Sequence, residues 1–257
     1  MINHVEKYIG TISHGSKSDS GSQYKLNIAA IPSSPNRDLK TYITLGLSKH
    51  DLNYKSRFEI LFVCSLKYDG LIFDMDGTLI DTMPVHARAW NMVGEQFGYR
   101  FNSQIMYDLG GATVSTIASA IMQDAGMPQE RLNEVIQAKR KLSYELIPTE
   151  SKLLPTFDVV RHYYQQKPIA LGSGSNRQII DMLMQKLDIK HYFNAIVSAD
   201  DVKEHKPHPE TFLRCAELAK AEPSRCIVFE DADLGVKAGL SAGMDVFDVR
   251  TREIIRA

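Results

Sequence analysis

The chain has 257 residues, of which 44% are hydrophobic and 24% charged, a composition typical of soluble globular proteins. Its net charge of −1 gives no global basic field that would favour nucleic acid or an anionic membrane. No apolar run approaches the ~20 residues that a helix needs to cross a bilayer. We therefore expect neither nucleic acid nor a membrane as a partner.

The cysteines indicate the compartment. There are three, Cys64, Cys215 and Cys226, an odd number without the CxxC spacing of zinc sites. This pattern argues against a disulfide framework and fits a reducing environment. Residues 1–10 lack a basic segment followed by an apolar core, so we expect no secretory signal. Together these features predict a cytoplasmic protein.

Residues 1–66 differ from the rest and are predicted to form an N-terminal extension. Residues 11–22 are rich in Ser, Gly and Lys, which predicts a loop or a disordered segment. Short strands are predicted over 41–47 and 58–64. The runs T-Y-I-T-L-G-L-S and R-F-E-I-L-F-V-C there resemble a fragment of bacterial suppressor-of-fused-like domains, and they hold no catalytic group. The alternative is an unrelated, loosely packed extension. The sequence names no protein partner for it.

A buried strand is predicted over 68–73, followed directly by Asp74 and Asp76. Residues two apart on an extended backbone point to the same side, so the two carboxylates are expected side by side. Adjacent carboxylates rarely both stay ionised without a cation, and Mg²⁺ prefers such hard oxygen ligands. One carboxylate could attack as a nucleophile while the other transfers a proton.

Helices dominate the next hundred residues. Apolar residues recur at a spacing of four over 81–98, which predicts a helix that Gly98 ends. Similar patterns follow at 115–125, 129–146 and 156–165. A single crossover between strands needs far less chain. We therefore predict an inserted helical cap over 83–150.

Strands and helices then alternate regularly, which predicts an α/β core of residues 67–82 and 151–257 with a parallel sheet covered on both faces. Ligands in such sheets bind at the carboxyl ends of the strands. The predicted strands are 168–173, 195–198, 226–230 and 244–249, and the helices between them are 177–187, 209–219 and 234–242.

Polar residues follow these strands at the edge where Asp74 and Asp76 are expected. Gly-Ser-Gly-Ser at 172–175 follows the second strand, and glycines there let the backbone approach an anion closely. Lys206 lies in a Lys-Pro-x-Pro turn, and Glu230-Asp231 ends a later strand.

In chain order, F-D-M-D-G-T-L-I-D, G-S-G-S, K-P-H-P and F-E-D-A-D-L-G resemble the four motifs of the haloacid dehalogenase-like (HAD) phosphatase superfamily. The resemblance spans about residues 67–249 and implies a Rossmann-like parallel sheet with an inserted α-helical cap. It implies that Asp74 is the nucleophile and Asp76 the general acid and base. It further implies an aspartyl-phosphate intermediate.

The remaining motif residues also acquire roles from this resemblance. Ser173, Gly174 and Lys206 are implied to bind the phosphoryl group. Mg²⁺ is implied to bind the Asp74 carboxylate, the Asp76 backbone carbonyl and Asp231, with Glu230 as a further ligand or as support for the site.

The position of the cap resembles the branch that includes beta-phosphoglucomutase and the bacterial fructose-1-phosphate phosphatase, with the closer likeness to the latter. Two residues match cap residues of that branch that reach the substrate: His86, and Lys141 at the end of the run A-K-R-K. Asp76 argues against a dehalogenase, which needs only one aspartate. Val114 stands where the mutase has an arginine for a second phosphate, which favours hydrolysis.

The sequence thus predicts a Mg²⁺-dependent phosphatase for small phosphorylated sugars. Two alternatives stay open: a beta-phosphoglucomutase-like isomerase, and an interaction protein that uses residues 1–66.

Overall fold

The computed structural model describes residues 9–12, 26–29, 64 and 67–257. Strands β1 (Ile9–Ile12) and β2 (Leu26–Ala29) pair antiparallel within the first of two compact units, residues 1–50. The predicted loop over 11–22 is therefore wrong for its first two residues, which belong to β1. The predicted strand over 41–47, and the segment likened to suppressor-of-fused domains except for Cys64, lie outside the described residues. Cys64 is helical and buried against the core, so the strand predicted to end there is wrong at that residue.

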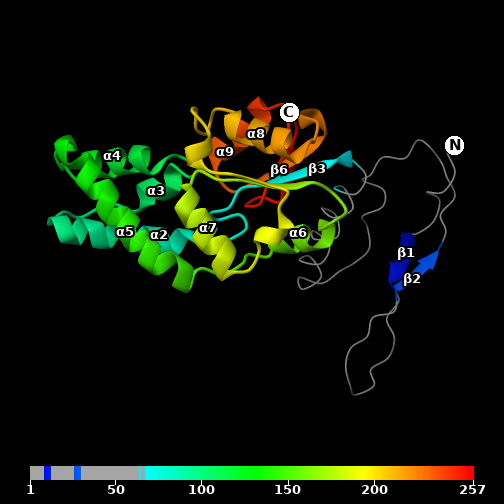
Figure 1. Ribbon diagram of the computed structural model, residues 1–257, viewed down its shortest axis with the longest axis horizontal. Coiled ribbons are helices and arrows are strands. Elements are labelled where there is room, and N and C mark those ends of the chain that lie inside the picture. The colour runs from blue at the N-terminus through cyan, green and yellow to red at the C-terminus, as the bar shows by residue number, and fades with distance from the viewer. Residues whose placement is uncertain (1–8, 13–25, 30–63, 65–66) are drawn as a thin grey trace, which may run out of the picture. The chain divides into compact units, whose positions relative to one another are not determined.

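A sheet with the strand order β5-β4-β3-β6-β7-β8 forms the centre of the second unit (Figure 1). All neighbours are parallel except β8, which pairs antiparallel at the edge. The parallel α/β core predicted from the strand-helix alternation is confirmed, whereas the three-residue β8 was missed because it is too short for a pattern. The strands are β3 (Gly70–Phe73), β4 (Ile169–Gly172), β5 (Ala195–Val197), β6 (Cys226–Glu230), β7 (Asp245–Asp248) and β8 (Glu253–Ile255).

The central strand β3 is buried on both faces. Leu71 and Phe73 pack in one hydrophobic cluster with helices α6 (Phe157–Tyr163) and α7 (Arg177–Lys186). Ile72 points to the opposite face, into a cluster with helices α8 (Glu210–Ala219) and α9 (Asp233–Ser241). Successive residues of a strand point to opposite faces of the sheet. Because both faces are buried here, every residue of the strand is apolar, which explains the unbroken apolar run.

The cap has its own hydrophobic cluster around Trp90, Ile121 and Val135. Gly98, with φ of 77°, ends α2 as predicted, because glycine adopts this left-handed conformation without strain. The five-residue α3 was missed because so short a helix repeats its apolar positions too few times to establish a helical pattern. The cap helices are α2 (Met83–Phe97), α3 (Gln104–Asp108), α4 (Val114–Asp124), η2 (Gln129–Arg131) and α5 (Leu132–Glu150).

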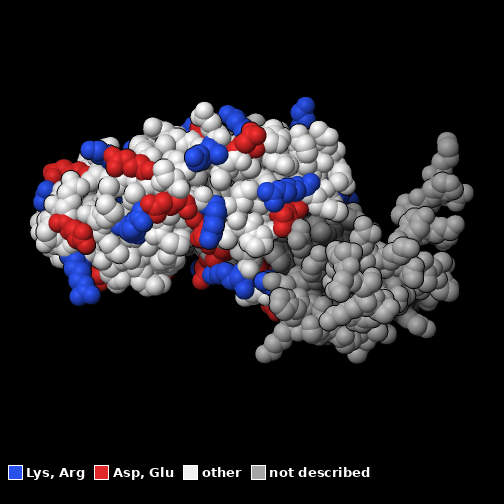
Figure 2. Space-filling model, turned by 90° about the horizontal axis from the view of Figure 1, so that it is seen from below, with Lys and Arg blue, Asp and Glu red and all other residues white. Residues whose placement is uncertain are grey.

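The remaining short 3-10 helices connect elements of the core. They are η3 (Lys190–Tyr192), η4 (Ala199–Asp201) and η5 (Pro223–Arg225). Within the part of the chain that the structure describes, no helix is both long and apolar enough to cross a membrane. On the face shown in Figure 2, basic and acidic side chains lie interspersed, as expected for a net charge near zero.

Candidate active site

Strand β3 carries Asp74 and Asp76 to the carboxyl edge of the sheet, and the turn after them requires glycine. Gly77 has φ of 84°, and a Cβ there would lie 2.2 Å from Oδ2 of Asp231. Asp231 itself follows β6, the parallel neighbour of β3. The absence of a side chain at Gly77 therefore lets the end of β6 approach the aspartates of β3.

Asp74 and Glu230 share one buried cation. Lys206 Nζ donates to Asp74 Oδ1 at 2.6 Å and to Glu230 Oε2 at 2.8 Å. Burial and the Glu230 charge raise the pKa of Asp74 well above its usual range, although Lys206 opposes the rise. Burial would lower the pKa of Lys206, but the two carboxylates outweigh it and raise that pKa. Lys206 thus stays charged beside the predicted nucleophile.

Both oxygens of Glu230 already have partners. Besides Lys206 on Oε2, the backbone amides of Asp231 and Ala232 donate to Oε1 at 3.1 Å and 3.0 Å. A Cβ at Gly235 would lie 1.9 Å from Glu230 Oε2, so α9 needs glycine there to leave room for the carboxylate. Glu230 orients Lys206 in this arrangement. Its predicted direct contact with the metal stays a prediction.

Three carboxylates fit the predicted Mg²⁺. Ligand oxygens of Asp74, Glu230 and Asp231 all lie within 4.8 Å of one another. Burial and the Glu230 charge raise the pKa of Asp231 to about 7, while Thr78 Oγ1 opposes this by donating to Asp231 Oδ1 at 2.9 Å. An all-oxygen donor set with mutually repelling charges suits a hard divalent cation. The Asp76 carboxylate lies outside this group, and the role of its backbone carbonyl stays a prediction.

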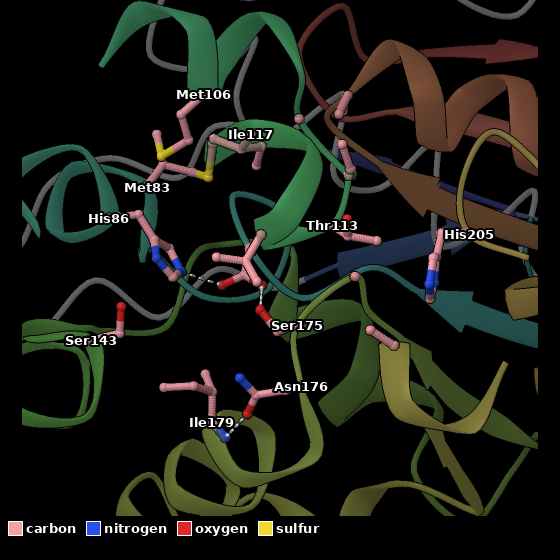
Figure 3. Close-up of a pocket in the computed structure, with 18 of the residues that line it drawn as sticks. Met83, His86, Met106, Thr113, Ile117, Ser143, Ser175, Asn176, Ile179 and His205 are labelled. Carbon is pink, nitrogen blue, oxygen red and sulfur yellow. Dashed lines mark hydrogen bonds and ion pairs between the residues drawn. The ribbon is translucent and has the colours of Figure 1, made fainter. Parts of the chain in front are cut away.

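Asp76 accepts several hydrogen bonds, and two of the residues beside it, His86 and Ser175, are labelled in Figure 3. Thr82 Oγ1 and Ser175 Oγ donate to it at 2.5 Å and 2.7 Å, Ser173 Oγ donates at 3.3 Å, and His86 Nε2 lies 3.4 Å from Oδ1. Burial alone would raise the pKa of Asp76, but His86, Thr82 and Ser175 hold it below its usual range. Two neighbouring aspartates therefore have pKa values displaced in opposite directions, as in many acid–base sites.

A lysine of the cap holds His86, but it is not the predicted one. Lys139 Nζ lies 2.6 Å from His86 Nδ1, which suits donation by the lysine and leaves His86 Nε2–H facing Asp76. Lys141 is exposed and lies outside the pocket. Residues two apart on a helix point to nearly opposite sides, because each residue turns the helix by about 100°. The predicted cap contact at Lys141 is therefore corrected to Lys139.

The sequence contained a signal for this lysine. Buried positions of α5 recur every four residues through Val135, Lys139, Ser143 and Ile147. The apolar residues at both ends of that series define the buried face, and Lys139 lies on it. Burial lowers the pKa of Lys139 to about 8, a fall that the Asp76 charge opposes and the Arg140 charge increases.

The loop after β4 contributes Ser173, Gly174 and Ser175. Ser173 is buried and its Oγ accepts from the Ser175 backbone amide at 3.0 Å. Gly174 lines the pocket, and a Cβ there would lie 2.9 Å from the carbonyl oxygen of Gly111 in the cap. Ser175 and Thr82 were missed as partners of Asp76, because hydroxyl residues in loops carry no pattern of their own.

Neighbouring charged residues serve the structure. Arg177, at the start of α7, donates to Ile196 O and forms an ion pair with Asp201. His208 Nδ1 accepts from the Glu210 backbone amide at 3.3 Å.

One pocket of about 300 Å³ lies between the strand ends and the cap (Figure 3). Asp74, Asp76 and Asp231 line it from the core, and His86 and Lys139 line it from the cap. The structure thus brings Asp74, Asp76, Ser173, Gly174, Lys206, Glu230, Asp231 and His86 together, and leaves out Lys141. A pocket with a buried carboxylate, an adjacent acid–base group and a cation can transfer an acyl- or phosphoryl-type group to the carboxylate.

Residues 68–243 match the haloacid dehalogenase-like hydrolase family, and the chain belongs to that family. The family predicted from the four motifs is confirmed. An uncharacterized protein of Haemophilus influenzae is 77% identical over 188 residues, which cover 73% of this chain and 94% of that protein. The fructose-1-phosphate phosphatase YqaB of Escherichia coli is 42% identical over 187 residues, which cover 72% of this chain and 97% of YqaB. The crystal structure of the beta-phosphoglucomutase of Clostridium difficile superimposes with a TM-score of 0.62 at 26% identity, covering 70% of this chain and 84% of that one.

Proposed function

We propose that the chain is a Mg²⁺-dependent phosphatase that hydrolyses small phosphorylated sugars of the fructose-1-phosphate kind through an aspartyl-phosphate. The observation that carries the proposal is the pair Asp74 and Asp76, adjacent in one pocket with pKa values displaced in opposite directions. Family membership and the 42% identity with an Escherichia coli fructose-1-phosphate phosphatase support it. The free cysteines Cys64, Cys215 and Cys226 agree with a cytoplasmic location.

In the first step, an oxygen of Asp74 attacks phosphorus and the bond between phosphorus and the sugar oxygen breaks. Asp76 supplies the proton that leaves with the sugar. The negative charge of the bound phosphate favours this, because a like charge raises the pKa of a neighbouring carboxyl group. Ser173, Gly174 and Lys206 bind the phosphoryl oxygens and offset their charge.

In the second step, water attacks the phosphorus of the aspartyl-phosphate. Asp76 takes the proton of that water, the bond to Asp74 breaks, and inorganic phosphate forms. The proton lost from Asp76 in the first step is thereby restored. Hydrogen bonds from Thr82, Ser175 and His86 stabilise the carboxylate in its basic form.

Asp74, the backbone carbonyl of Asp76 and Asp231 would hold Mg²⁺, with Glu230 as a further ligand or as the group that orients Lys206. Bound there, the cation supplies charge neutralisation between the nucleophile and the phosphate. Cap closure by α2 and α5 keeps bulk water from the first step.

Val114 lines the pocket and offers no cation from α4, which supports hydrolysis over a beta-phosphoglucomutase-like isomerase. An interaction role for residues 1–66 stays a prediction, because that segment lies mostly outside the described residues.

The test is phosphate release from a panel of phosphorylated sugars, with Mg²⁺ and with EDTA. We expect release with Mg²⁺, loss with EDTA and recovery when Mg²⁺ is added back. Activity that is indifferent to EDTA would contradict the metal site. Glucose 6-phosphate formed from beta-glucose 1-phosphate would identify the isomerase instead.

A further inference from the structure

Two hydrogen-bond donors of the pocket residues have no acceptor. Among the described residues, three buried side-chain polar atoms lack a hydrogen-bond partner: Trp90 Nε1, Arg140 Nε and Ser151 Oγ. Trp90 and Arg140 both line the pocket, and Ser151 does not. Trp90 is 1% exposed. Buried donors are nearly always paired in folded proteins, so two unpaired ones on residues that line a single pocket point to a ligand that brings acceptors.

Arg140 differs from the other cations of this site. Lys206 is paired with Asp74 and Glu230, and Lys139 donates to His86. Arg140 makes no hydrogen bond or ion pair with any residue that the structure describes. Arg140 directly follows Lys139 on α5, and its charge adds to the burial that lowers the pKa of Lys139 to about 8. An anion beside this pair of cations would relieve their repulsion.

The pocket is divided by charge. Its acidic lining residues, Asp74, Asp76, Asp200, Glu230 and Asp231, all come from the core. The described cap residues that line it include no carboxylate.

The start of α4 adds to the positive character of the cap side. Val114 and Ser115, its first residues, line the pocket, and Thr113 caps the helix by accepting from the Thr116 amide at 3.2 Å. A helix N-terminus carries partial positive charge.

We propose that Arg140 binds a second anionic group of the substrate on the cap side of the pocket, so that among phosphorylated sugars the site favours those that carry a second phosphate or a carboxylate. This inference rests on the proposed function, in which the phosphate to be hydrolysed lies at Asp74. A guanidinium matches both carboxylate and phosphate with two parallel hydrogen bonds.

The test compares kcat/KM within two substrate pairs that differ in a second anion. Fructose 1,6-bisphosphate against fructose 1-phosphate reports on a second phosphate, and 6-phosphogluconate against glucose 6-phosphate reports on a carboxylate. The proteins are the full wild-type chain, Arg140→Gln, Arg140→Lys and Lys141→Gln. Lys141 is the matched control, since it is the next residue on α5 but is exposed and outside the pocket. Thermal unfolding of each variant checks that it is folded.

We expect the wild type to prefer the doubly anionic member of at least one pair, and the pair that responds identifies the second anion. Arg140→Gln should lower that kcat/KM ratio by roughly 10- to 100-fold, the range for a hydrogen bond to a charged group. Arg140→Lys should retain part of the preference, and Lys141→Gln should keep the wild-type ratio.

Equal ratios in the wild type and in folded Arg140→Gln or Arg140→Lys, with phosphate still released, would overturn this inference and leave the proposed function standing. The same fall in Lys141→Gln would also overturn it, because the effect would then come from net charge. Absence of phosphate release from every substrate in the wild type with Mg²⁺ would overturn the proposed function, and this inference with it.

Discussion

Lys139 bears its charge in a buried position, which predicts that its removal stabilises the protein at neutral pH. The residue is 6% exposed, and burial lowers its pKa from 10.5 to about 8. That difference corresponds to roughly 3 kcal/mol of unfavourable free energy below pH 8, at about 1.4 kcal/mol per tenfold change in proton affinity. Against it stand the hydrogen bond to His86 and the contact with the Trp90 ring at 5.4 Å, together worth about 1–2 kcal/mol.

We therefore expect Lys139→Met to raise the free energy of unfolding by about 1–2 kcal/mol at pH 7. The folded state binds the Lys139 proton more weakly than the unfolded state does. The wild type consequently gains stability as the pH rises from about 8 towards 10.5, and the variant lacks this gain. Between pH 7 and pH 10 the advantage of the variant should fall by about 2 kcal/mol.

Urea unfolding at both pH values, followed by the fluorescence of Trp90, measures this difference. Trp90 is the one tryptophan of the chain and lies in the cap beside Lys139. Lys141→Met is the control, because it removes the same charge from an exposed position of α5 and should change stability by less than about 0.5 kcal/mol. A pH-independent difference for Lys139→Met, or the same pH dependence in the control, would refute the reasoning.

Three further substitutions test the catalytic side of the pocket. Asp74→Asn should abolish phosphate release and leave the fold intact by circular dichroism; activity near that of the wild type would exclude Asp74 as the nucleophile. Lys206→Met should destabilise the protein by about 3–5 kcal/mol in urea unfolding, since it leaves the buried carboxylates of Asp74 and Glu230 without their cation, and wild-type stability would contradict that account. Gly235→Ala should lower kcat at least about tenfold, because the new Cβ would lie 1.9 Å from Glu230 Oε2 and displace the group that orients Lys206; unchanged kinetics would show that Glu230 does not have this role.

The catalytic edge of the core was accessible from the sequence because its information is local. Asp74 and Asp231 directly follow buried apolar runs, and carboxyl ends of neighbouring parallel strands meet at one edge. The order of the four motifs then placed Ser173 and Lys206 at that edge too. Short elements such as α3 and β8 escaped, because fewer than six residues do not establish a period.

The cap side depended on packing between elements. The choice between Lys139 and Lys141 follows from which face of α5 packs against α2, and the motif A-K-R-K contains both lysines. The buried positions of α5 that include Val135 and Ile147 place Lys139 on the buried face. The sequence alone does not show which face of a helix is buried until the helix that packs against it is known.

The sequence by itself determined that Asp74, Asp76 and Asp231 follow strand ends and that Lys206 lies in a turn, because strand periodicity and turn chemistry depend on a few consecutive residues. Only the tertiary structure decided how the pKa values of those groups differ from one another. The displacement of the pKa of Asp74 upward and of Asp76 downward depends on burial and on Lys206, Glu230 and hydroxyls brought together from distant segments. Desolvation and charge–charge interactions act through space, so the chain order does not specify them.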